Sequence, residues 1–164
     1  MKNTIQVYGL PRSGTNFLEW SLVQYFENIT YKNHYKMCDV EGITQYKKNV
    51  AVKHSFPSFE YSDKIIVIYK DFEKWSKSYE KYTGKLPSKI VWENYMNKSK
   101  KLDSDNTLII SHSELYSHYE DNLHFIEKKF SLRLKDIEIV KPKNYMNKLG
   151  ANSKPIPNEI YNHE

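Results

Sequence analysis

The chain has 164 residues, of which 39% are hydrophobic and 27% are charged, and its formal net charge is +5. This length fits one domain that buries its core without disulfide or metal staples, so we expect a single domain over residues 1–164. The only cysteine, Cys38, excludes an internal disulfide framework and a cysteine-built zinc site, and it favours the reducing cytoplasm. We find no membrane-length apolar run and no signal-peptide pattern, and therefore expect a cytoplasmic protein with no membrane partner. The positive charge favours an anionic ligand, but no motif indicates nucleic-acid binding.

Four short runs rich in valine and isoleucine predict strands, because strands that are covered on both faces are continuously apolar. They cover residues 4–8, 49–53, 64–69 and 107–111.

Stretches with apolar residues at helical spacing lie between and after these runs. Strands that alternate with helices predict an α/β fold with a mostly parallel central sheet flanked by helices. Residues 28–48 show no clear period and receive no assignment, and the proline-containing tail of residues 141–164 predicts irregular chain. The predicted helices cover residues 15–27, 71–82, 88–101 and 115–130.

A glycine-containing loop, residues 8–16, joins the first predicted strand to the first predicted helix. Its two glycines have the spacing of the nucleotide P-loop, in which backbone N–H groups and a helix N-terminus hold phosphate. Thr15 stands where the P-loop has its lysine, and Asn16 stands where it has the hydroxyl that binds magnesium. The positive side chain is instead Arg12, inside the loop. The loop is therefore suited to an anion but lacks the lysine and the metal ligand of an NTPase, and we expect no metal site.

The sequence Pro-Arg-Ser-Gly-Thr-Asn-Phe-Leu over residues 11–18 resembles the 5′-phosphosulfate-binding loop of sulfotransferases that use PAPS, 3′-phosphoadenosine 5′-phosphosulfate. That loop is usually written P-[KR]-S-G-T-[TN]-x-L. The resemblance implies a three-layer P-loop-type α/β fold, with the loop at the carboxyl end of a central strand. The residues that it assigns to the donor in this loop are Pro11, Arg12, Ser13, Gly14, Thr15 and Asn16.

Residues 50–57, Val-Ala-Val-Lys-His-Ser-Phe-Pro, resemble the K-T-H-x-P element of the same family, with the histidine one position early. Sulfuryl transfer needs a base for the acceptor and positive charge near the transferred group. The resemblance thus implies His54 as the base, with Lys53 and Arg12 as the catalytic cations. If His54 points away from the loop, His34 or Glu19 becomes the candidate base.

Residues 65–79 resemble the element that holds the 3′-phosphate of the donor, a strand followed by R-[DN]-P and, further along, S-Y. Lys70 matches the arginine and Ser78 matches the serine, whereas Phe72 replaces the proline. A lysine supplies charge without the bidentate fork of arginine. The resemblance implies that Lys70 and Ser78 bind the 3′-phosphate.

The sequence Ser-Glu-Leu over residues 113–115 resembles the E-D-L turn that follows a later strand of the family, and we interpret it as structural. The resemblance covers residues 4–130. The glycine-rich loop that closes over the nucleotide in many members is not evident. His112 and His118 lie six residues apart, without the spacing of metal ligands.

The resemblance implies an enzyme that moves a sulfuryl group from PAPS to a hydroxyl or amine of a small-molecule or carbohydrate acceptor. A nucleotide or nucleoside kinase shares the strand–loop–helix start, although the lysine after Gly14 is missing. The third possibility is a module that binds a nucleotide or another anion without catalysis.

Overall fold

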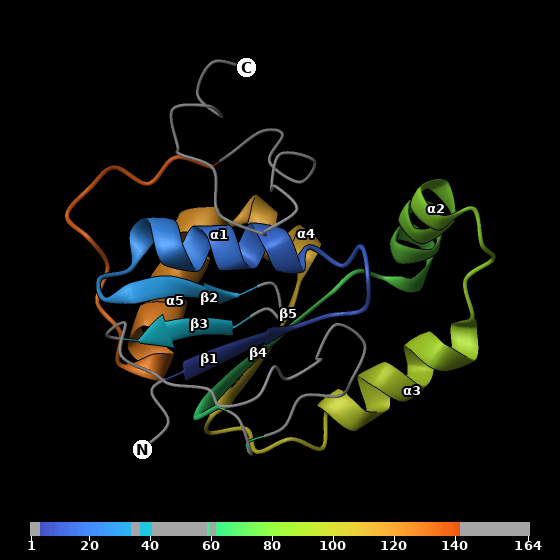
Figure 1. Ribbon diagram of the computed structural model, residues 1–164, viewed down its shortest axis with the longest axis horizontal. Helices are drawn as coiled ribbons and strands as arrows, with labels where there is room; N and C mark the ends of the chain where they lie inside the picture. The colour runs from blue at the N-terminus through green and yellow to red at the C-terminus, as the bar shows by residue number, and fades with distance from the viewer. Residues whose placement is uncertain (1–3, 34–36, 41–58, 60–61, 142–164) are drawn as a thin grey trace.

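Strands and helices alternate along the chain in the computed structural model, which describes residues 4–33, 37–40, 59 and 62–141 (Figure 1). The strands and helices predicted at residues 4–8, 64–69, 107–111, 15–27, 71–82 and 88–101 are confirmed, with helix ends that differ by one or two residues. The elements are β1 (Thr4–Tyr8), α1 (Thr15–Tyr25), β2 (Ile29–Asn33), β3 (Met37–Val40), β4 (Lys64–Tyr69), α2 (Phe72–Thr83), α3 (Lys89–Ser99), β5 (Thr107–Ser111), α4 (His112–Ser117) and α5 (Tyr119–Phe130).

The described strands form one sheet in the order β2-β3-β1-β4-β5. Strand β4 pairs in parallel with β1 on one side and with β5 on the other, which confirms an α/β fold with three parallel strands flanked by helices. The sheet is less parallel than predicted, because β3 pairs antiparallel with both β1 and β2. These two strands come from the segment that received no assignment. The strand predicted at residues 49–53 lies outside the described residues.

Helices α1, α4 and α5 cover one face of the sheet. Ile66 and Ile68 of β4 point to this face and belong to the same buried cluster as Phe17 of α1 and Leu123 of α5. Burial of these large side chains removes apolar surface from water, which contributes about 25 cal/mol for each Å². The helices are thereby fixed on the sheet.

The opposite face of the sheet packs against α3 and the chain that follows it. Ile65 and Val67 of β4 are fully buried there, and Tyr95 of α3 and Leu102 pack against them. Strand β4 is therefore buried on both faces, which explains its uninterrupted apolar sequence. None of the helices in the described part of the chain is long and apolar enough to span a membrane.

The single helix predicted over residues 115–130 is wrong, because α4 and α5 are separate helices with a break at His118. Helix α4 starts early because the Ser111 hydroxyl accepts a hydrogen bond from the Glu114 N–H, 3.0 Å away. The Asn122 amide donates additional hydrogen bonds to the Glu114 and His118 carbonyls, which also accept the backbone N–H groups of His118 and Asn122.

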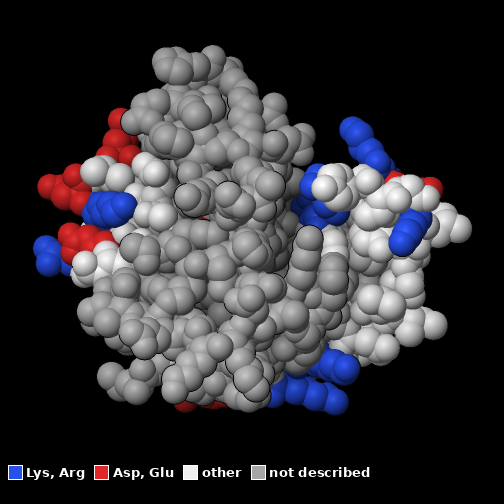
Figure 2. Space-filling model, viewed as in Figure 1, with Lys and Arg blue, Asp and Glu red and all other residues white. Residues whose placement is uncertain are grey.

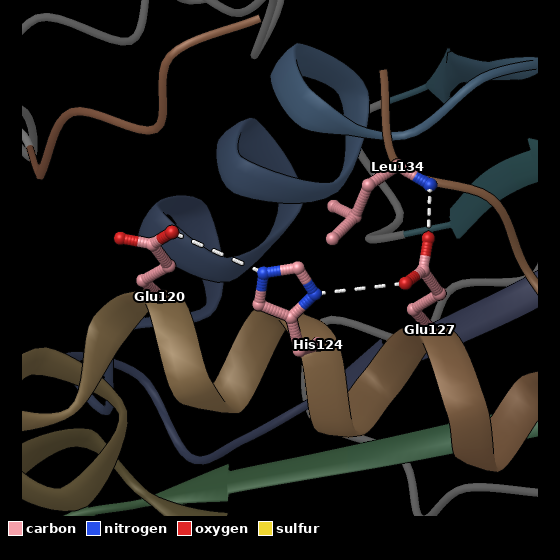
Figure 3. A network of polar contacts seen from close by, with 4 residues as sticks. All are labelled: Glu120, His124, Glu127 and Leu134. Carbon is pink, nitrogen blue, oxygen red and sulfur yellow. Dashed lines mark hydrogen bonds and ion pairs between the residues drawn. The ribbon is translucent and has the colours of Figure 1, made fainter. Parts of the chain in front are cut away.

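Side-chain contacts hold the chain that follows α5 close to that helix (Figure 3). Glu127 accepts a hydrogen bond from the Leu134 N–H at 2.5 Å, and its other oxygen lies 3.6 Å from Nδ1 of His124. Further along, the Tyr25 hydroxyl donates to the Val140 carbonyl at 2.6 Å. The segment as far as Val140 is thus tied to α1 and α5, and the irregular tail predicted after it falls almost wholly outside the described residues.

Candidate functional site

The loop between β1 and α1 approaches β4 so closely that only glycine fits at its start. A β-carbon at Gly9 would lie 2.6 Å from the carbonyl oxygen of Ile68, a backbone atom that cannot move aside. The Ser13 N–H donates to the Leu10 carbonyl at 3.0 Å, which closes a tight turn. Arg12, inside this turn, has a φ of 74°, a left-handed conformation that is uncommon for residues other than glycine. The loop is therefore a compact turn whose shape β4 restricts.

Helix α1 begins directly after this turn, with Gly14 as its N-cap. Gly14 has no side chain that could cap the helix, and the first turn of α1 carries no acidic residue. The first hydrogen bond within the helix runs from the Leu18 N–H to the Gly14 carbonyl at 3.2 Å. The N–H groups of the preceding helical residues therefore have no acceptor within the helix. The partial positive charge at this end favours an anion.

The Arg12 guanidinium lies over the ring of Tyr82, with its Cζ 4.3 Å from the ring centroid. Its Nε is buried and finds no hydrogen-bond acceptor within the described residues. A buried donor without an acceptor costs roughly 1–3 kcal/mol. A bound anion beside the loop would accept this N–H, so Arg12 fits an anionic ligand.

Two tryptophans from different helices hold the backbone of the site. The Trp75 indole N–H of α2 donates to the Pro11 carbonyl at 2.8 Å, and the Trp92 indole N–H of α3 donates to the Lys70 carbonyl at 3.0 Å. Lys70 follows β4 directly and is half-buried. Burial and the charge of Arg12 lower the pKa of its ammonium group. The predicted loop residue Arg12 and the predicted phosphate residue Lys70 therefore come close enough for their charges to interact.

The structure adds His112, which the sequence did not assign to this site. Its ring is half-buried at the start of α4, directly after β5, and its Cδ2 lies 2.6 Å from the position of a β-carbon on Gly14. Burial and the charges of Lys70 and Lys74 lower its pKa to about 4. The signal that could have found it is its place directly after a predicted parallel strand, because the carboxyl ends of parallel strands meet at one edge of the sheet.

Lys74 of α2 also reaches this edge of the sheet, where its Nζ donates to the Ser113 hydroxyl at 3.0 Å. Basic side chains are visible over α2 in the space-filling view (Figure 2). The site thus combines a helix N-terminus with three basic side chains, those of Arg12, Lys70 and Lys74. This arrangement is suited to an anion, which basic side chains attract by charge and N–H donors hold by hydrogen bonds.

The other predicted residues fall in different places. Ser13 is buried in the loop and Thr15 is the first residue of α1. Ser78 is half-buried in α2, one turn beyond Lys74, whereas Lys70 precedes that helix. Glu19 in α1 is 1% exposed, so its carboxylate is buried in the helix layer. The predicted catalytic residues Lys53 and His54, and the reserve base His34, lie outside the described residues.

A pocket of ≈ 260 Å³ adjoins the loop on the side of α2 and α3. One wall is loop backbone, and the other walls are mostly aromatic and aliphatic side chains that suit an apolar or planar group. The lining residues are Gly9, Leu10, Pro11, Trp75, Tyr79, Leu86, Ser88, Val91 and Tyr95.

Among the described residues, no three histidine, cysteine or acidic side chains gather closely enough to hold a metal ion. Comparisons of the chain with models of protein families, with curated proteins and with solved structures found no match.

Proposed function

We propose that the protein is a sulfotransferase with a P-loop-type site, which moves a sulfuryl group from PAPS to a hydroxyl or amine of an acceptor. The observation that carries this proposal is the meeting of Arg12, Lys70 and the N-terminus of α1 at one edge of the sheet. The buried Nε of Arg12, which finds no acceptor in the described part of the chain, further supports an anion there. The residue pattern of the loop then favours a phosphosulfate, because Thr15 and Asn16 replace the lysine and the hydroxyl of an NTPase.

Two sets of basic groups suit the two charged ends of the donor. In the proposal, Arg12 and the N–H groups of residues 14–16 hold the 5′-phosphosulfate, because the Ser13 N–H already donates to the Leu10 carbonyl. Lys70 and Ser78 hold the 3′-phosphate, and Lys74 adds charge beside them. Charge-assisted hydrogen bonds of this kind contribute about 1.5–3 kcal/mol each.

In the proposed reaction the acceptor oxygen or nitrogen forms a bond to sulfur while the bond from sulfur to the bridging oxygen breaks. 3′-Phosphoadenosine 5′-phosphate leaves with the electron pair of that bond. His54 takes the acceptor proton, and Lys53 and Arg12 neutralise the charge that develops on the sulfuryl and bridging oxygens. The roles of Lys53 and His54 rest on the resemblance of residues 50–57 to the family element.

The pocket beside the loop supports a small-molecule acceptor with an apolar or aromatic part. It shares Gly9, Leu10 and Pro11 with the loop, so a group held there lies next to the proposed phosphosulfate site. Apolar walls bury carbon skeletons well but leave most hydroxyls of a sugar without partners, which favours such a molecule over a carbohydrate. We propose the cytoplasm as the location, because Cys38 is the only cysteine of the chain.

Two measurements on the intact chain test this function. Calorimetry compares 3′-phosphoadenosine 5′-phosphate with ATP and Mg²⁺, and we expect binding of the former and little or none of the latter. Transfer of label from ³⁵S-labelled PAPS to a panel of phenols, alcohols and amines then tests catalysis. Preference for ATP would favour a kinase-like enzyme, and binding of the desulfated nucleotide without any transfer would favour a non-catalytic module.

A further inference from the structure

The ring of His112 packs against three residues at the edge of the proposed anion site. It packs against Gly14 at the start of α1, as the 2.6 Å approach of its Cδ2 to the β-carbon position shows. The Phe17 ring meets it edge-on at a centroid distance of 5.7 Å, and the Tyr116 ring stacks on it at 6.0 Å and 11°. These contacts from α1 and α4 fix the position of the imidazole beside the loop.

Within the described part of the chain, two lysines lower the pKa of this ring by their charge. Lys70 at the end of β4 and Lys74 of α2 both oppose a positive charge on His112. The charge of Arg12 in the loop in turn lowers the pKa of Lys70. Lys141 lies over the Tyr116 ring that stacks on His112, with its Nζ 4.2 Å from the centroid of the Tyr116 ring. The neighbours from α1 and α4, Phe17 and Tyr116, are uncharged at neutral pH. An imidazolium here would lose hydration and face two ammonium groups.

We infer that His112 is neutral in the free protein and takes up a proton when a multiply charged anion binds at the loop, so that it becomes a further cation facing that anion. This inference rests on the anion site of the proposed function. A sulfate or phosphate held at the loop by Arg12 and the N-terminus of α1 offsets part of the positive charge that keeps the ring neutral. The same anion stabilises the imidazolium directly, because opposite charges a few ångströms apart favour the charged form.

Because binding of the proton to His112 and binding of the anion to the loop favour each other, the affinity for the anion depends on pH. The pKa of His112 in the free protein is about 4. If the bound anion restores the ordinary histidine value of about 6.5, the anion binds about tenfold more tightly at about pH 5.5 than at about pH 8. A histidine outside the site produces no such gain.

Inorganic sulfate is the probe, because it stays fully ionised over this range and any proton taken up belongs to the protein. The experiment follows the ring proton signals of the six histidines by NMR between about pH 5 and pH 8, with and without saturating sulfate. We expect the His112 signal to titrate only in the presence of sulfate. Calorimetry should show the tenfold gain in affinity on acidification, and should lose it in His112→Gln. His124→Gln, which removes an exposed histidine of α5, should keep the gain.

The possible outcomes separate this inference from the proposed function. Sulfate binding with no change in the His112 titration, and with the same pH dependence in His112→Gln, would overturn the inference and leave the anion site standing. Absence of sulfate binding at either pH would contradict the anion site and the inference together. The wild-type titration decides the matter even if His112→Gln does not fold.

Discussion

Gly14 and His112 fit together only because Gly14 has no side chain, since a β-carbon there would lie 2.6 Å from Cδ2 of the histidine. The contact joins the start of α1 to the start of α4, directly after β5, and these two positions are almost a hundred residues apart in the sequence. Gly14 also has a φ of 101°, a conformation that side chains rarely adopt. Two separate physical effects therefore require glycine at the start of the helix.

We expect Gly14→Ala to lower the free energy of unfolding by about 2–3 kcal/mol, from backbone strain together with the clash against His112. Gly84→Ala is the matched control, because Gly84 has a φ of 68° but no atom within 4 Å of its β-carbon position. Strain alone should cost this variant about 1 kcal/mol. Urea denaturation measures both values. Equal losses would show that the His112 contact adds nothing to the requirement for glycine.

Arg12→Ala should weaken binding of 3′-phosphoadenosine 5′-phosphate by about tenfold or more, because a charge-assisted bond to the 5′-phosphate is lost. Calorimetry gives the affinity. Arg133→Ala is the control, since Arg133 is the only other arginine of the chain and its exposed side chain pairs with Glu27 at 3.4 Å. Unchanged affinity in Arg12→Ala would remove this residue from the site.

Lys70→Ala should reduce the preference for 3′-phosphoadenosine 5′-phosphate over the nucleotide without the 3′-phosphate, by about tenfold. Ser78→Ala should reduce the same preference by a smaller factor, because a hydroxyl donates one neutral hydrogen bond. Lys77→Ala, which removes an exposed lysine beside Ser78, should leave the preference unchanged. The ratio of the two dissociation constants is the quantity to compare. If Lys70→Ala and Lys77→Ala give the same ratio, the 3′-phosphate lies elsewhere.

His112 should make the protein less stable as the pH falls. Burial, Lys70 and Lys74 lower its pKa in the folded protein to about 4, from the ordinary value of 6.5. Between these values the unfolded chain binds the proton and the folded chain does not, so the free energy of unfolding decreases as the pH falls from about 6.5 toward about 4. Because the ring is partly exposed and screened, we expect a loss of about 1–2 kcal/mol rather than the full shift.

Chemical denaturation at several pH values checks this expectation in the wild type and in His112→Gln. Carboxylates titrate in both proteins, so the difference between the two curves isolates the histidine. Below about pH 6.5 the free energy of unfolding of the wild type should fall steadily relative to that of His112→Gln. His124→Gln serves as the control for loss of a histidine on the surface of α5. Parallel curves for the wild type and His112→Gln would contradict the lowered pKa.

The sequence alone predicts an element when the residues within that element already indicate how it is buried or where it turns. Strand β4 was predictable because its apolar run is needed to fill both faces of the sheet, and Ile65, Ile66, Val67 and Ile68 are indeed fully buried. The loop was predictable because Gly9 and Gly14 mark a strand–helix turn suited to an anion. The roles of Lys53 and His54 stay predictions, because both residues lie outside the described part of the chain.

Only the tertiary structure decided which distant residues meet. The sequences of β2 and β3 show no clear hydrophobic period. Their place in the sheet comes from the pairing of β3 with both β1 and β2, and not from a run of apolar residues. At the break beside His118, the Asn122 amide donates to the Glu114 and His118 carbonyls and so connects the end of α4 to the start of α5. His112 joins the site because β5 pairs in parallel with β4, which brings the ends of both strands to the edge where α1 begins. Strand order depends on contacts between segments that are far apart in the sequence, and local residue patterns do not predict those contacts.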